Sequence, residues 1–118
     1  MRLAELKDIL KADVLTGDSL LHIDVNNACG ADLMSDILAD TKMNAVLLTG
    51  LTHPQILKTA SISDFAAIIL VRDKVPPQEL IEMARRQNMP LLRTKYSLYE
   101  ACGMLYTAGL RGNGQRLE

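Results

Sequence analysis

A chain of 118 residues with a net charge of −1 and 48% hydrophobic residues is long enough to bury its own core, and it lacks the charge excess that attracts a polyanion. We therefore expect no nucleic-acid partner, and no membrane either, since no apolar run is long enough to span one. Two cysteines are too few for a disulfide framework or a zinc site, so we expect a cytoplasmic protein with no metal and no cofactor. We expect one domain over residues 1–110 and a tail over residues 111–118, disordered or partly vector-derived.

The first elements predicted along the chain are a short helix and a β-hairpin. One helical face is indicated by three leucines spaced three and four residues apart, Leu3, Leu6 and Leu10. Residues 12–16 and 20–25 have the pattern of two strands, and Gly17-Asp18 predicts the turn of a hairpin between them. Residues 26–30 predict a loop, and Asp32 is placed to cap the helix that follows.

The rest of the chain alternates short apolar runs with helical segments. The apolar runs cover residues 45–49, 66–71 and 90–93. Capping boxes predict helix starts at Thr52 and Ser97, and a third helix opens at Pro76-Pro77. This alternation is typical of a parallel sheet covered by helices. We predict a single three-layer α/β domain with a mainly parallel central sheet, helices on both faces and an N-terminal β-hairpin.

Polar loops follow each of the three apolar runs. In a parallel sheet these loops meet beyond the carboxyl ends of the strands, which is where ligands bind. Helix N-termini and basic side chains at that edge favour negative charge. We therefore predict a site for a small anionic ligand, plausibly a nucleotide, formed by Thr49, Gly50, Thr52, His53, Arg72, Asp73, Lys74, Thr94 and Lys95.

No catalytic motif accompanies this predicted site. We therefore favour a regulatory or ligand-binding module over an enzyme. Two alternatives stay open: a small phosphoryl- or acyl-transfer enzyme, for which His53 is the candidate group, and a pure protein-interaction subunit. The tyrosines around the last helix and the six methionines suggest apolar surface for a homodimer. We expect its contact to come from residues 97–109 or from the hairpin at 12–25.

Several segments resemble the DRTGG-domain family, over about residues 2–110. The matching segments are Cys29–Leu38, Leu51–Ile56, Leu70–Asp73 and Met89–Thr94, followed by Ser97–Glu100. The chain departs from the motif that names the family. Thr52-His53 stand where Asp-Arg is expected, and Val71-Arg72-Asp73 where Thr-Gly-Gly is expected.

The resemblance implies a fold of the MurF and HPr kinase/phosphorylase N-terminal-domain type, without a kinase domain. It also implies a regulatory, dimer-forming module, because members of the family accompany CBS domains in a regulatory pyrophosphatase or precede a phosphotransacetylase. Stand-alone copies occur in anaerobic bacteria, often beside hydrogenase-type genes. The resemblance thus adds a hydrogenase-type system as the setting for an interaction subunit.

Overall fold

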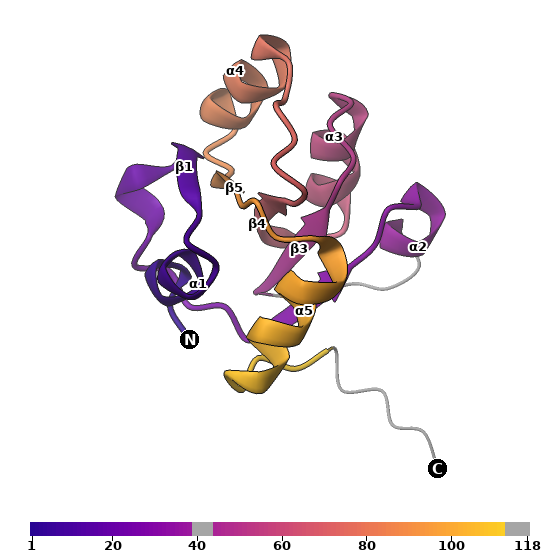
Figure 1. The fold of residues 1–118 in the computed structure, drawn as a ribbon. Coiled ribbons are helices and arrows are strands. Elements are labelled where there is room, and N and C mark those ends of the chain that lie inside the picture. Colours follow the sequence, from indigo (N-terminus) through magenta and orange to yellow (C-terminus); the bar gives the residue numbers. More distant parts are fainter. Residues whose placement is uncertain (39–43, 113–118) are drawn as a thin grey trace.

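A computed structural model describes residues 1–38 and 44–112 of the chain as one α/β domain (Figure 1). Its elements in chain order are α1 (Leu3–Leu10), β1 (Asp13–Thr16), a 3-10 turn η1 (Asp18–Leu20), β2 (Asn27–Gly30), α2 (Met34–Leu38), β3 (Ala45–Thr49), α3 (Gln55–Ile62), β4 (Phe65–Leu70), α4 (Gln78–Arg86), β5 (Leu91–Arg93) and α5 (Leu98–Thr107). The predicted α/β class is confirmed.

The sheet of the described residues has five strands in the order β1-β5-β4-β3-β2. Strands β2, β3, β4 and β5 run parallel, and β1 pairs antiparallel with β5 at one edge. All five residues of β3 are buried, which explains its continuous apolar sequence: helices cover both of its faces. The prediction of a mainly parallel sheet is confirmed.

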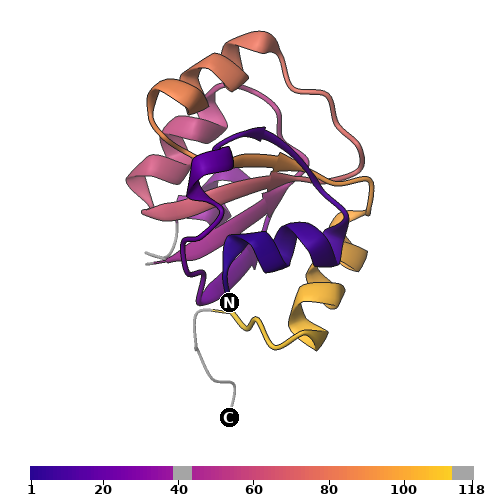
Figure 2. The same ribbon diagram turned by 90° about the vertical axis from the view of Figure 1, so that its left-hand side faces the viewer.

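Helices cover the sheet on both sides and create two apolar cores (Figure 2). On one side α1 and α5 pack on a core that includes Leu6, Leu48, Ile69 and Leu105. On the other side α2, α3 and α4 pack on a core that includes Ile37, Leu47, Leu57, Ile68 and Leu80. Side chains of adjacent residues in β3 and β4 enter opposite cores, as the two-residue period of a strand requires.

The predicted N-terminal hairpin is wrong. Strand β1 lies at one edge of the sheet and pairs with β5, and residues 20–25 do not form its partner strand. These residues hold the start of α1 instead: the N–H groups of Leu3 and Ala4 donate to the carbonyl oxygens of Ile23 and Leu21 at 3.0 and 2.9 Å. The first turn of a helix has free N–H groups, and the carbonyl oxygens of this turn segment accept from two of them.

Residues 26–30, predicted to be a loop, contain β2. The pairs Asn27–Ala45 to Gly30–Leu48 align β2 in parallel with β3. Asparagine and glycine have low strand propensity, so pairing with β3 rather than local preference makes this segment a strand.

The predicted tail begins at Arg111, and its first residues are described. The carbonyl oxygen of Arg111 accepts from the N–H of Ala28 at 2.8 Å, so this residue lies beside the start of β2. Residues 113–118, the rest of the predicted tail, lie outside the described residues. Within residues 1–38 and 44–112, no helix has the length and apolar character needed to cross a membrane.

Candidate functional site

The loops after β3, β4 and β5 meet at the carboxyl edge of the sheet, as the sequence predicts. Backbone hydrogen bonds join them: Val71 N–H donates to Thr49 O at 3.0 Å, Arg72 N–H to Tyr96 O at 2.7 Å, and Asp73 N–H to Thr94 O at 2.9 Å. The ends of three strands are therefore held as one polar edge.

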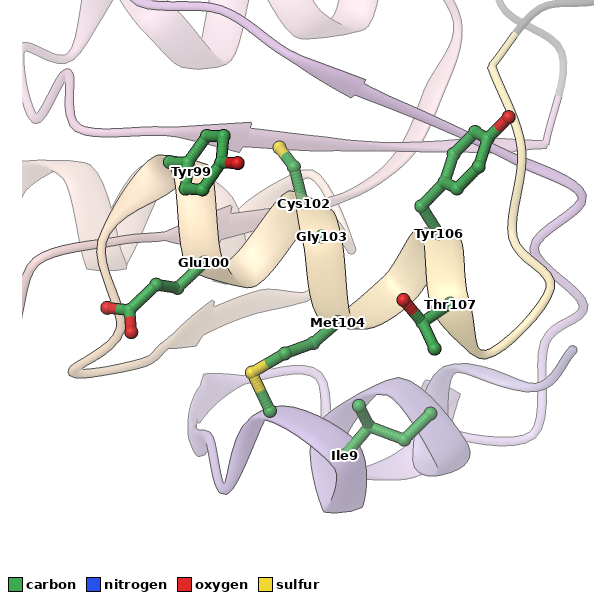
Figure 3. A pocket seen from close by; sticks show the side chains of 8 residues that line it. All are labelled: Ile9, Tyr99, Glu100, Cys102, Gly103, Met104, Tyr106 and Thr107. Atoms are coloured by element: carbon green, nitrogen blue, oxygen red, sulfur yellow. The ribbon is translucent and has the colours of Figure 1, made fainter.

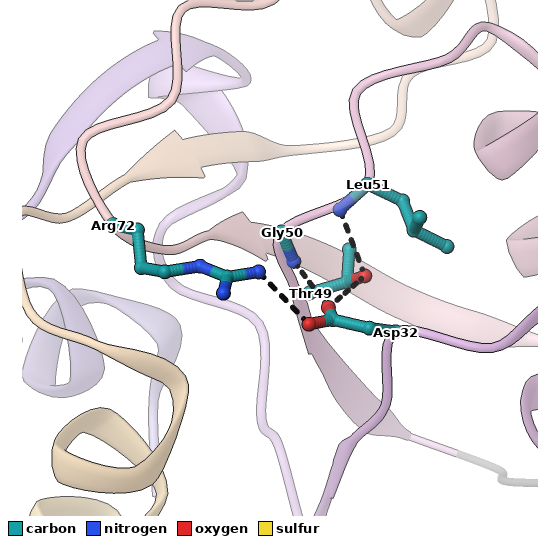
Figure 4. A network of polar contacts seen from close by, with 5 residues as sticks. All are labelled: Asp32, Thr49, Gly50, Leu51 and Arg72. Carbon is teal, nitrogen blue, oxygen red and sulfur yellow. Dashed lines mark hydrogen bonds and ion pairs between the residues drawn. The ribbon is translucent and has the colours of Figure 1, made fainter.

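At the centre of this edge, three hydrogen-bond donors converge on the carboxylate of Asp32 (Figure 4). The Thr49 hydroxyl and the Gly50 N–H donate to Oδ1 at 3.1 and 2.6 Å. The Arg72 guanidinium donates from Nη2 to Oδ2 at 2.9 Å. Together they form a preorganised place for an oxyanion, and a carboxylate of the same chain occupies it.

The sequence reasoning missed this role of Asp32. Asp32 was expected to cap the following helix, but the hydrogen bonds found for its carboxylate go to the ends of β3 and β4. It lies just beyond β2, the strand that was predicted as a loop, so its position beside β3 could not be inferred. If residues 27–30 are predicted as a strand, the acidic residue just after them becomes a candidate for contacts with the ends of the neighbouring strands.

Arg72 and Asp73 have positive φ angles of 60° and 54°. Residues with a Cβ atom rarely adopt this conformation, at a cost of about 1–2 kcal/mol each. Both side chains form ion pairs there, Arg72 with Asp32 at 2.9 Å and Asp73 with Arg93 at 2.9 Å. Arg72 also lies over Gly50, where a Cβ atom would overlap the guanidinium. The loop thus holds a cation against the end of β3.

The other residues of the predicted site divide into two groups. Lys74 and Lys95 are exposed at the same edge and are placed to attract an anion. Thr94 is buried, and its hydroxyl donates to the carbonyl oxygen of Leu10 at 2.7 Å. The side chain of Thr94 therefore ties β5 to α1 rather than facing a ligand.

The predicted capping box at Thr52 is wrong. Helix α3 begins at Gln55 with Pro54 as its N-cap, and the N–H of Gln55 donates to Nδ1 of His53 at 3.1 Å. The imidazole of His53 thus accepts the hydrogen bond that the hydroxyl of Thr52 was predicted to accept. Because Nδ1 accepts this bond, the neutral ring carries its proton on Nε2. The helix start predicted at Ser97 is confirmed, since Ser97 is the N-cap of α5 and its Oγ accepts from the N–H of Glu100 at 3.1 Å.

Two hollows of the described surface lie away from this edge. A groove of about 810 Å³ runs along the outer side of α5, beside α1 (Figure 3), and is lined by Ile9, Tyr99, Glu100, Cys102, Gly103, Met104, Tyr106 and Thr107. A smaller hollow of about 560 Å³ includes Asn44 and Pro90, which precede β3 and β5, and so lies at the opposite edge of the sheet. Among the described residues, no group of three acidic, histidine or cysteine side chains could hold a metal ion.

Cys102 lies between the groove and the sheet. Burial raises the pKa of its thiol above its usual value, and the nearby charges of Cys29 and Asp32 act in the same direction. A thiol with a raised pKa is a poor nucleophile at neutral pH. Cys102 is therefore suited to packing rather than to covalent chemistry.

A family model described as the DRTGG domain matches residues 5–108. The chain belongs to the DRTGG-domain family. No curated protein matches it. Among solved structures, this DRTGG domain is similar to the CBS and DRTGG domains of the regulatory region of Clostridium perfringens pyrophosphatase, crystallised with the activator diadenosine tetraphosphate. The TM-score is 0.67 at 15% sequence identity. The match covers 88% of this chain and 45% of that one, so the fold is shared and this chain spans less than half of the neighbour's length.

Proposed function

We propose that this DRTGG domain is a non-catalytic regulatory module that binds a small anionic ligand, a nucleotide, where β3, β4 and β5 end. The observation that carries the proposal is the convergence of a hydroxyl, an N–H and a guanidinium on one carboxylate at this edge. Such a donor set suits the oxygen atoms of a phosphate. The nucleotide activator in the pyrophosphatase regulatory region supports the class of ligand.

The residues of the proposed site have different roles. Arg72 supplies the charged contact, and Gly50 supplies a backbone N–H and leaves room for the Arg72 guanidinium, which a Cβ atom would overlap. The exposed side chains around them, Lys74, Lys95 and His53, with the half-buried Thr52, form the rim that attracts and orients the anion. Asp73 and Thr94 hold the loops in place through Arg93 and Leu10.

Thermal unfolding with a panel of AMP, ADP, ATP and diadenosine tetraphosphate tests the proposal. We expect at least one nucleotide to raise the free energy of unfolding, by about 2.7 kcal/mol at one hundred times its dissociation constant. Arg72→Gln should abolish this effect. Arg85→Gln, which removes an equal charge from exposed α4, should retain it.

A panel in which no nucleotide stabilises the protein would overturn the proposal, as would equal losses in the two arginine variants. The enzyme alternative predicts a turnover that His53→Ala abolishes. The panel therefore also includes an assay for nucleotide hydrolysis with that variant.

We further propose that the module is a homodimer formed through the outer face of α5. Tyr99 and Tyr106 are 89% and 58% exposed there, which leaves large aromatic surface in water. Gly103 lies between them in the middle of the helix, where glycine costs about 1 kcal/mol relative to alanine. Among the described residues, a Cβ at Gly103 would meet no atom within 4 Å outside the backbone of α5 itself, so packing within the domain does not require the glycine. Close approach of a second helix explains it.

The charges around Gly103 favour a second copy of α5 as that helix. Glu100 lies three residues before Gly103 and Tyr106 three residues after it, and the guanidinium of Arg111 lies 3.9 Å above the Tyr106 ring. In an antiparallel pair crossing at Gly103, Glu100 of one copy meets the Tyr106–Arg111 stack of the other. A two-fold axis repeats this contact.

Light scattering at micromolar concentration tests the dimer. We expect twice the 13.0 kDa mass of the chain for the unaltered protein and for Ser61→Glu, which adds a charge on α3. Gly103→Glu should give the mass of one chain, because a charged side chain blocks the close approach. A monomer in the unaltered protein, or a dimer that persists in Gly103→Glu, would contradict the α5 interface.

A further inference from the structure

The carboxylate of Asp32 accepts from three donors at the place where β3 and β4 end. Asp32 belongs to neither strand. It comes from the segment between β2 and α2, and its side chain is 37% exposed. Arg72, its ion-pair partner, is 50% exposed. An ion pair this accessible contributes little to stability, so the fold does not depend on it.

The backbone that carries the three donors is held in place independently of Asp32. Thr49 is fully buried, and its hydroxyl oxygen accepts from the N–H of Leu51 at 3.1 Å, so its proton is directed outward. The Gly50 N–H is part of the backbone at the end of β3. The backbone of Arg72 is positioned by its own N–H, which donates to Tyr96 O at 2.7 Å, and its guanidinium lies over Gly50. Removing the carboxylate would therefore leave the Thr49 and Gly50 donors in place, with the Arg72 guanidinium beside them.

We propose that Asp32 is a built-in competitor: its carboxylate fills the oxyanion position of the ligand site, and a phosphate group of the incoming ligand displaces it. This inference rests on the proposed function and specifies how the site is controlled. A phosphate accepts from all three donors and carries more charge than a carboxylate, so it forms the stronger pair with the guanidinium. Repulsion between the two anions then drives Asp32 outward.

Displacement also links the site to the rest of the domain. Asp32 lies two residues before Met34, where α2 begins, and α2 packs against α3 through contacts such as Thr59 with Met34. With Asp32 released, the segment that leads into α2 loses its attachment to β3 and β4. Ligand binding thereby changes the restraint on α2, which is a means of passing the signal to a partner.

The test is a titration of the full chain with inorganic phosphate, followed by calorimetry and by amide chemical shifts. We expect Asp32→Ala to bind phosphate up to about fivefold more tightly than the unaltered protein, since an exposed ion pair is worth up to about 1 kcal/mol. The shift changes should include the Gly50 amide. Asp32→Asn, which keeps the shape of the side chain, should show the same direction of change.

Two further variants show whether the gain in phosphate affinity comes from the donors that Asp32 leaves free or from the loss of a negative charge anywhere on the protein. Glu82→Ala removes a charge of equal sign from α4 and should leave phosphate affinity unchanged. Asp32→Ala with Arg72→Gln should lose the gain. The proposal is overturned if neither Asp32 variant binds phosphate more tightly, if Glu82→Ala gains as much, or if the gain survives without Arg72.

The outcomes separate this inference from the proposed function. If a nucleotide binds the unaltered protein and the Asp32 variants gain nothing, the regulatory module stands and the competitor role fails. If the Asp32 variants gain phosphate affinity and no nucleotide stabilises the unaltered protein, the oxyanion position stands and the nucleotide function fails.

Discussion

Arg72 combines an unfavourable backbone with a charge placed over Gly50, so its backbone and side-chain effects on stability can be separated. Arg72→Gly and Arg72→Ala both remove the guanidinium, and they differ only in the Cβ atom at φ 60°. We expect the glycine variant to have the higher free energy of unfolding, by about 1 kcal/mol, because glycine adopts this conformation without strain. Urea denaturation measures the difference. Equal stability of the two variants would show that the loop relaxes when the ion pair is lost.

Thr94 was predicted as a ligand contact and is instead a buried structural donor. Thr94→Val keeps the shape of the side chain and removes the bond to the carbonyl oxygen of Leu10, so we expect a loss of about 1–3 kcal/mol in the free energy of unfolding. Thr94→Ser keeps the hydroxyl and should lose less than Thr94→Val. Affinity for a nucleotide should be unchanged in Thr94→Val. If Thr94→Val reduced the affinity for a nucleotide and left the free energy of unfolding unchanged, Thr94 would be a ligand contact.

At the scale of elements, the packing of α5 on β2 depends on a small residue facing a thiol. A Cβ added at Gly30 would overlap Sγ of Cys102 and lie 3.3 Å from Cδ1 of Leu98. We expect Gly30→Ala to destabilise the protein, and we expect Cys102→Ala to reduce that cost by about 0.5–1 kcal/mol, since residues in contact are energetically coupled.

A double-mutant cycle by urea denaturation measures this coupling. The control is Gly112→Ala, because a Cβ there would meet no atom within 4 Å and Cys102 should not alter its effect. Additive effects of Gly30→Ala and Cys102→Ala would contradict the contact between α5 and β2.

For the whole molecule, the sheet order predicts where the fold is most resistant to opening. Strands β3 and β4 have a paired strand on each side and lie between the two cores, whereas β1 and β2 form the edges. We expect backbone amides of β3 and β4 to exchange with solvent most slowly, at rates set by global unfolding, and those of β1 and β2 to exchange faster. Hydrogen exchange followed by NMR measures this order. Equal protection of β1 and β4 would contradict the arrangement.

The sequence by itself determined the elements whose pattern is local. The spacing of Leu3, Leu6 and Leu10 predicted α1, the apolar runs predicted β3, β4 and β5, and Ser97 predicted the start of α5. It also predicted that the three strand-end loops meet, because parallel strands place their carboxyl ends at one edge. The likeness to the N-terminal domain of HPr kinase/phosphorylase stays a prediction.

Only the tertiary structure decided which strand pairs with which and what each polar side chain contacts. Strand β1 pairs with β5 across 75 to 80 residues of sequence, and β2 is a strand because β3 lies beside it. Asp32, remote in sequence from Gly50 and Arg72, reaches them only after β2 is in place. Hydrophobic periodicity reports which face of an element is buried, whereas partners distant in the chain are selected by packing and by hydrogen bonds that no local pattern encodes.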